Sequence, residues 1–167
     1  MKLTTFSDYT LRVLMFLAIN RDRLATIPEI ATAYDISENH LMKVVHQLAR
    51  SGVIDTVRGK GGGIRLAREP ETIRLGQILR ASEGSAPIVE CLSEDGGACR
   101  IAPACRLAAV LMRAFGALYA TLDEFTVADL VQAPRRLNAL LMPNSSLSNA
   151  SVARSTPNAF FKSTRLA

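Results

Sequence analysis

Apolar residues recur at helical spacing along the N-terminal third of the chain. The pattern predicts a first helix that is capped by Ser7 and runs to about Asn20. Thr26 and Glu29 have the spacing of a capping box, which predicts a second, short helix ending near Ala33. The chain therefore begins with a long helix and a short one.

A third helix is predicted from its cap, Ser37, to Arg50, with Gly52 just beyond its end. About three residues separate it from the short helix, which is the helix-turn-helix pattern. Its apolar positions have the spacing of a buried face: Leu41, Val44, Val45 and Leu48. Its polar positions lie on the opposite face: Asn39, Lys43, His46 or Gln47, and Arg50. Such amide, cationic and imidazole groups suit base edges and phosphates, and an ordinary solvated helix face fits them too.

Two strand-like runs follow, at residues 53–57 and 64–66, on either side of the segment RGKGGG. They predict a hairpin directly after the third helix, which makes the unit a winged helix. Its glycines allow positive φ angles and a close approach to a DNA backbone. Arg58, Lys60 and Arg65 supply charge for phosphate or minor-groove contacts. A nucleotide-binding loop is excluded because no Gly-Lys-Ser/Thr motif opens a helix here, whereas a purely structural hairpin stays open.

The C-terminal half contains a long helical pattern between Ala104 and Leu122. Its apolar positions step by three and four, as in a heptad seam: Ala108, Leu111, Phe115, Leu118 and Leu122. A core helix would show this pattern, but a dimerisation helix is favoured, because a protein that binds palindromic DNA needs a two-fold partner. Thr126 caps a last short helix that runs through Val131.

These elements predict a mainly α fold: a winged helix-turn-helix domain with a small β-hairpin wing and a long C-terminal dimerisation helix. We expect the DNA-binding domain at residues 1–82, a cysteine loop at 83–106, and the dimerisation helix with a short terminal helix at 104–142. Residues 143–167 contain six Ser, three Asn and no acidic residue, which predicts a disordered basic tail.

The net charge of +5 is unevenly distributed along the chain. Residues 1–80 carry 12 Lys or Arg against 8 Asp or Glu, a balance of +4. This indicates an anionic partner, with double-stranded DNA as the first candidate. No apolar run is long enough to span a bilayer and no signal peptide is evident, so we expect a cytoplasmic protein without a membrane partner. We expect no enzyme, because the chain has two His and no nucleophile–base pair.

The three cysteines, Cys91, Cys99 and Cys105, lie within fifteen residues of one predicted loop. Their spacing excludes a zinc ribbon or a thioredoxin-like motif, both of which need a Cys-x2-Cys pair. The cluster indicates a thiolate metal site, with buried structural thiols as the alternative. Thiolates select zinc, cuprous copper or iron–sulphur clusters. A tetrahedral zinc site or a cubane cluster needs a fourth ligand, and a carboxylate is the remaining choice, because His40 and His46 lie on the third helix and suit DNA better. Asp8 is a candidate, although the residues alone favour a simple charge role at the helix N-terminus, paired with Arg12, over a ligand role.

Several segments together resemble the nitric-oxide-sensitive repressors called NsrR. They are TFSDYTLR at residues 5–12, SENHLMK at 37–43, RGKGGGIRL at 58–66, CRIAPACRL at 99–107 and TVADLV at 126–131. The resemblance covers about residues 1–142. It implies a homodimeric winged-helix repressor with one iron–sulphur cluster per subunit, of the 4Fe–4S or the 2Fe–2S type.

The resemblance also implies roles for particular residues. Cys91, Cys99 and Cys105 would hold the cluster, and Asp8 of the partner subunit would complete its ligands. Asn39, His40 and Lys43 lie near the start of the third helix, where base contacts concentrate. Ser37, the predicted cap, would also touch phosphate.

Two related regulators share part of this pattern. The iron–sulphur-biogenesis regulator IscR has a histidine three residues after its third cysteine, where this chain has Ala108. The iron-responsive regulator RirA has a similarly wide first cysteine gap but lacks the Asn-His pair, and some NsrR-like sequences have a shorter first gap. An iron-responsive or redox-responsive regulator of the same fold, or a DNA-binding protein with structural zinc, are therefore the alternatives.

Overall fold

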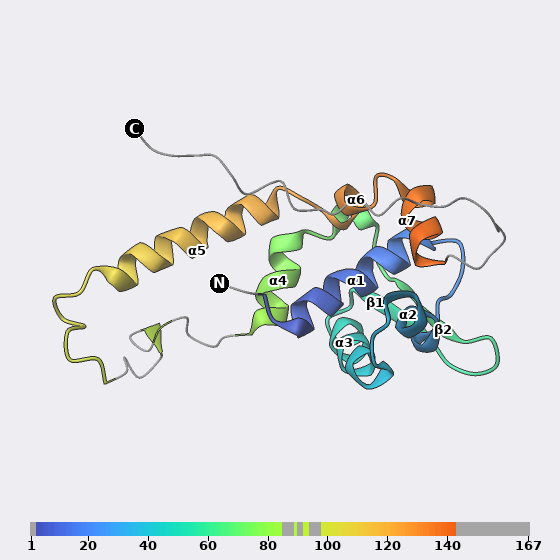
Figure 1. Ribbon diagram of the computed structural model, residues 1–167, viewed down its shortest axis with the longest axis horizontal. Helices are drawn as coiled ribbons and strands as arrows, with labels where there is room; N and C mark the ends of the chain where they lie inside the picture. Colours follow the sequence, from blue (N-terminus) through green and yellow to red (C-terminus); the bar gives the residue numbers. More distant parts are fainter. Residues whose placement is uncertain (1–2, 85–88, 90–91, 94–97, 143–167) are drawn as a thin grey trace, which may run out of the picture.

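The computed structural model describes residues 3–84, 89, 92–93 and 98–142, and these residues form a mostly helical structure with one β-hairpin (Figure 1). The elements in chain order are α1 (Thr5–Ile19), α2 (Ile27–Tyr34), α3 (Glu38–Arg50), β1 (Ile54–Val57), β2 (Gly63–Leu66), a 3-10 helix (Pro70–Thr72), α4 (Leu75–Glu83), α5 (Leu107–Asp123), α6 (Val127–Leu130) and α7 (Pro134–Leu141). This order confirms the predicted winged helix-turn-helix fold with a long helix in the C-terminal half.

Helix α1 begins earlier than predicted, because Thr4 and not Ser7 is its cap. The Oγ1 atom of Thr4 accepts a hydrogen bond of 3.1 Å from the backbone N–H of Ser7. Ser7 is fully buried, and its hydroxyl lies 2.7 Å from the hydroxyl of Ser82 on α4. The prediction of Ser7 as a cap was therefore wrong: this residue joins α1 to α4.

The core forms around α1, which packs against α3, α4 and the wing. Its largest fully buried side chains come from distant parts of the chain: Phe16, Leu14, Ile30, Leu41, Ile73, Val13, Val44 and Val127. Val127 belongs to α6, so the C-terminal helices return to the same core as the winged helix. Helix α7 also contacts α1, and its Leu141 is partly buried against the core.

The helix-turn-helix unit follows its local sequence signals. Thr26 and Glu29 form the predicted capping box at the start of α2. Asp35 ends α2 with a φ of +53°, which turns the chain toward α3. Ser37 occupies the predicted cap position of α3, but its side chain makes no capping hydrogen bond. The predicted core face of α3 is confirmed, since Leu41, Val44, Val45 and Leu48 are all buried.

The wing is an antiparallel pair in which Ile54 is opposite Leu66 and Val57 is opposite Gly63. A third segment fixes it to the body, because Ala25 and Ile64 exchange backbone hydrogen bonds of 3.0 and 2.8 Å. Gly59 and Gly61 have φ angles of +99° and +78° at the tip. These angles explain why the turn needs glycine.

Helix α5 begins at Leu107, not at Ala104, because the chain around Cys105 forms turns. With 17 residues it is about 26 Å long. Its N-terminal half extends away from the other helices, and its C-terminal half lies beside α4 (Figure 1). No residue of α5 is buried within the described chain. The predicted seam positions are the half-buried ones, together with Tyr119 and Asp123 near the end of the helix.

Candidate DNA-reading face and cysteine site

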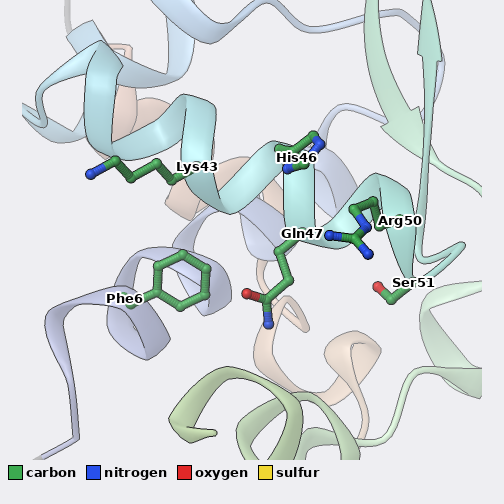
Figure 2. Close-up of a pocket in the computed structure, with 6 residues that line it drawn as sticks. All are labelled: Phe6, Lys43, His46, Gln47, Arg50 and Ser51. Carbon is green, nitrogen blue, oxygen red and sulfur yellow. The ribbon is translucent and has the colours of Figure 1, made fainter.

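The outward face of α3 carries the polar residues that the sequence singled out. Ser37, Asn39, His40 and Lys43 are all exposed at its N-terminal end. Farther along the helix, Lys43, His46, Gln47 and Arg50 line a hollow of about 520 Å³ together with Phe6 and Ser51 (Figure 2). The imidazoles and cations of α3 are therefore exposed to solvent, as is the amide of Asn39.

Gln47 differs from its neighbours in this hollow, because its carboxamide points toward α1 and α4 (Figure 2). Its Nε2 atom donates a hydrogen bond of 2.8 Å to the carbonyl oxygen of Ala81. The same last turn of α4 is tied to α1, since the backbone N–H of Thr4 donates to Glu83 Oε1 over 2.9 Å. Burial raises the pKa of Glu83, but hydrogen bonds from Ser7 and Thr4 outweigh this effect and leave the pKa lowered. The chain immediately before the cysteine loop is thus fixed to both α1 and α3.

The three predicted cations of the wing do not have equal surroundings. Arg58 and Lys60 are exposed at the tip and have no ion-pair partner in the described part of the chain. Arg65 lies opposite Asp55 in the hairpin, and its Nε atom is 3.6 Å from Asp55 Oδ2. The tip therefore presents two uncompensated positive charges, whereas the charge of Arg65 is partly balanced within the hairpin.

Cys99 and Cys105 have free, half-buried thiols. Successive turns connect them: the N–H of Ala102 donates to Cys99 O over 3.1 Å, and the N–H of Cys105 donates to Ala102 O over 3.3 Å. The N–H of Leu107 lies 3.4 Å from Cys105 Sγ and donates to it. Cys91 lies outside the described residues. Within the residues described, no three His, Cys, Asp or Glu side chains come together to hold a metal ion.

Asp8 is half-exposed and forms an ion pair with Arg12, one helical turn along α1. Arg12 contacts both carboxylate oxygens, at 3.2 Å through Nε and at 2.9 Å through a terminal nitrogen. The guanidinium also lies over the ring of Tyr34, 5.7 Å from its centroid. Burial raises the pKa of Tyr34, and the charge of Arg12 opposes this rise. Asp8, Arg12 and Tyr34 line an open hollow of about 500 Å³ beside the helix-turn-helix turn.

The donor set fits an iron–sulphur cluster. Free thiols are the ligands that such clusters prefer, and an accessible carboxylate can replace a missing fourth thiol. Asp8 and the two described cysteines do not form one group within a single chain.

Sequence reasoning missed Tyr9 and Tyr34, which border the Asp8 hollow. Tyr34 sits at the end of the short helix, and this position could have marked it. Nothing in the sequence marks Tyr9, whose neighbours depend on how α1 packs against α3.

Residues 3–133 match the model of a family described as "Iron-dependent Transcriptional regulator". The chain belongs to the Rrf2 family. The regulator NsrR of Bacillus subtilis is 46 % identical over 142 residues, which cover 84 % of this chain and 97 % of that protein. A regulator of the same name from Shouchella clausii is 43 % identical over 142 residues, covering 84 % and 95 % of the two chains. The family match at residues 3–133 includes α3, the wing and the positions of the three cysteines.

Solved structures of Rrf2-type regulators have the same fold. IscR of T. potens aligns with a TM-score of 0.64 and 26 % identity, over 79 % of this chain and 87 % of that chain. CymR of B. subtilis, a global cysteine regulator, aligns with a TM-score of 0.63 and 29 % identity, over 79 % and 97 %. These relatives are regulators and not enzymes, in agreement with the sequence. None of the helices in the described ranges has the length and apolar character needed to cross a bilayer.

Proposed function

We propose that this Rrf2 protein is a homodimeric, iron–sulphur-cluster-dependent transcriptional repressor that responds to nitric oxide. The observation that carries the proposal is the exposed polar face of α3 beside a wing tip with two unpaired cations. A winged helix presents such a face to the major groove, while its wing contacts the backbone or the minor groove. The identity to regulators named NsrR supports nitric oxide as the signal.

The N-terminal end of α3 is the part that would contact bases. Asn39 suits adenine through its carboxamide, and Lys43 suits guanine. His40 and Ser37 are exposed in the same region, and the Ser37 hydroxyl would donate to a phosphate. Arg58 and Lys60 would add contacts that do not depend on sequence, with a smaller share from Arg65 because of its pairing with Asp55.

Cys91, Cys99 and Cys105 would hold the cluster, of the 4Fe–4S or the 2Fe–2S type, and the partner subunit's Asp8 would complete its ligands. When bound, the cluster supplies iron that reacts with nitric oxide. The carboxylate of Asp8 is a harder ligand than a thiolate and binds such iron less firmly. When Asp8 is released, its carboxylate can return to the ion pair with Arg12 at the edge of the helix-turn-helix unit. Asp8 thus has two alternative partners, the cluster of the partner subunit and Arg12, and the balance between them would act as a two-state switch.

Helix α5 supports the dimer, because its exposed surface is unusually apolar. Leu107, Val110 and Met112 are exposed by 53 %, 60 % and 62 %. Exposed apolar side chains on a helix with no fully buried residue among the described part of the chain are typical of an interface. A partner helix at this place would bring the cysteine segment that precedes α5 into the dimer and hold two α3 helices on one palindromic operator.

Anaerobic purification tests the proposal. We expect a brown protein with iron and sulphide in equal amounts, a dimer by light scattering, and loss of visible absorbance on addition of nitric oxide. Operator affinity should fall in the same titration. Cys99→Ala should lose cluster and operator affinity together, and operator binding that is unchanged and independent of metal would overturn the mechanism. A colourless protein, even after reconstitution with iron and sulphide, would contradict the cluster and leave the winged helix intact.

A further inference from the structure

The ring of Tyr9 on α1 lies against the ring of His40 on α3. The centroids are 6.0 Å apart and the ring planes are tilted by 49°. This separation falls within the range of about 4.5–7 Å over which aromatic pairs attract one another. Tyr9 is half-buried and packs against the core, whereas His40 is exposed in the first turn of α3. The contact therefore joins a ring held by the core to a side chain on the outward face of α3.

Tyr9 follows Asp8 directly in the sequence, and both residues line the same open hollow together with Arg12. Because the two residues share one turn of α1, a displacement of the Asp8 backbone also displaces the Tyr9 ring. One residue thus links the Asp8 hollow to the start of α3.

The start of α3 has few other attachments on its outward side. Ser37 makes no capping hydrogen bond, so the side chain at the cap does not fix the first turn. Leu41 is fully buried and holds the inner side. The ring of Tyr9 contacts the His40 side chain from outside α3, so loss of this contact would let the exposed His40 side chain change its position.

We propose that Tyr9 is a positioning residue that couples the state of Asp8 to the placement of His40 at the base-contacting end of α3. The inference rests on the proposed function, in which Asp8 is a ligand and α3 enters the major groove. When Asp8 leaves its ion pair with Arg12 and binds the cluster of the partner subunit, Tyr9 moves with α1 and shifts His40. The preference among bases near His40 changes as a result, and the phosphate contacts of the wing stay as they are.

The first measurement tests the contact itself, in the cluster-free protein. The chain has two His, and both lie on α3, so His46 serves as an internal reference in proton NMR spectra. Tyr9→Leu should change the chemical shift of the His40 ring proton and leave that of His46 in place. Tyr9→Phe keeps a ring at this position and should leave both resonances unchanged. Tyr119→Leu removes a tyrosine from α5 and controls for the loss of a tyrosine elsewhere. Identical His40 resonances in Tyr9→Leu and the wild type would overturn the inference.

The second measurement tests the coupling. DNA selected by the wild type from a randomised duplex library provides the ligand, and its affinity is measured for cluster-loaded and cluster-free protein. Tyr9→Leu should keep the visible absorbance of the cluster and should still bind the DNA. The ratio of the two affinities should fall by about two- to tenfold, the contribution of an aromatic pair. His40→Ala, at an exposed position where folding is not at risk, should lower the same ratio.

The outcomes separate this inference from the proposed function. If the wild type selects no DNA in either state, the proposed function fails and the inference fails with it. If the wild type responds to the cluster and Tyr9→Leu and His40→Ala respond equally strongly, the proposed function stands and Tyr9 is not the coupling residue.

Discussion

Asp123 at the end of α5 lies so close to Gly76 on α4 that a Cβ atom at position 76 would be 2.2 Å from Asp123 Oδ1. It would also be 2.8 Å from the backbone carbonyl oxygen of Tyr119. The Asp123 side chain has little room to move, because its other oxygen pairs with Arg80 at 2.5 Å. Arg80 in turn lies over the Tyr119 ring, 5.1 Å from its centroid. This contact packs the C-terminal end of α5 closely against α4.

We predict that Gly76→Ala lowers the free energy of unfolding by about 1–3 kcal/mol, because overpacking at a close helix contact forces the two helices apart. Urea denaturation measures the change. Gln77→Ala, at the adjacent exposed position of α4, is the matched control and should stay within about 0.5 kcal/mol of the wild type. Equal stability of Gly76→Ala and the wild type would mean that α5 is not held at Gly76.

The wing makes a second prediction, on the salt dependence of DNA binding. Lys60 is exposed at the tip without an ion-pair partner in the described chain, so Lys60→Ala should weaken binding to all sequences alike. The slope of log affinity against log salt concentration should become shallower by about one. Arg65→Ala should reduce the slope less, because Asp55 already balances part of its charge. Fluorescence anisotropy at several salt concentrations gives both slopes, and an unchanged slope for Lys60→Ala would remove this residue from the interface.

The sequence alone was sufficient where a structural feature depends on neighbours within one helical turn. The capping box of Thr26 and Glu29 and the buried face of α3 are both patterns of this kind. The same reasoning failed at Ser7. Thr4 is also a good capping residue, and which of the two caps α1 depends on how α4 packs against the start of α1. Ser82 gives the Ser7 hydroxyl a partner in the core, and no local pattern contains that information.

Helix α7 was missed, although Pro134 in its first turn and the spacing of Leu137 and Leu141 are ordinary helix signals. They were overlooked because the last predicted helix ended at Val131. For the candidate DNA-binding and cysteine residues, the sequence identified the types of side chain. Most of their positions depend on tertiary packing, which the sequence pattern does not contain. The pairing of Arg65 with Asp55 follows from the hairpin register, and the contact of Tyr9 with His40 follows from the packing of α1 on α3. Neither can be inferred from spacing along the chain.

The capping box at α2 makes stability depend on pH. The hydrogen bond from Arg23, together with that from the Thr26 N–H, outweighs burial and holds the pKa of Glu29 below its usual value. A carboxyl group whose pKa is lower in the folded state stabilises the fold above its unfolded pKa, and this contribution is lost as the pH falls through the folded pKa. We predict that Glu29→Gln is less stable than the wild type at about pH 6 and that the gap narrows toward about pH 3.

Urea denaturation across this pH range measures the gap. Glu71→Gln, at an exposed position of the 3-10 helix, removes the same charge elsewhere and serves as the control. A gap between Glu29→Gln and the wild type that stays constant with pH would show that ionised Glu29 is not what stabilises the start of α2.

The ion pair of Asp8 with Arg12 makes the last prediction, which concerns how firmly the cluster is held. In the proposed dimer, Asp8 cannot serve as a ligand and keep its bidentate contact with Arg12 unchanged. Arg12→Leu removes this competitor, so the cluster should be lost more slowly to an iron chelator. Exposed ion pairs contribute about 0.2–1 kcal/mol, so the effect should be at most about fivefold.

Asp8→Asn should act in the opposite direction and speed the loss, because a neutral amide is a poorer ligand than a carboxylate. Arg21→Leu breaks the exposed ion pair with Glu69, which is remote from the start of α1, and should leave the rate unchanged. The decay of visible absorbance under anaerobic conditions gives all three rates. Equal rates of cluster loss for Arg12→Leu, Asp8→Asn and the wild type would show that Asp8 is not a ligand. Opposite shifts would show that Arg12 and the cluster compete for the Asp8 carboxylate.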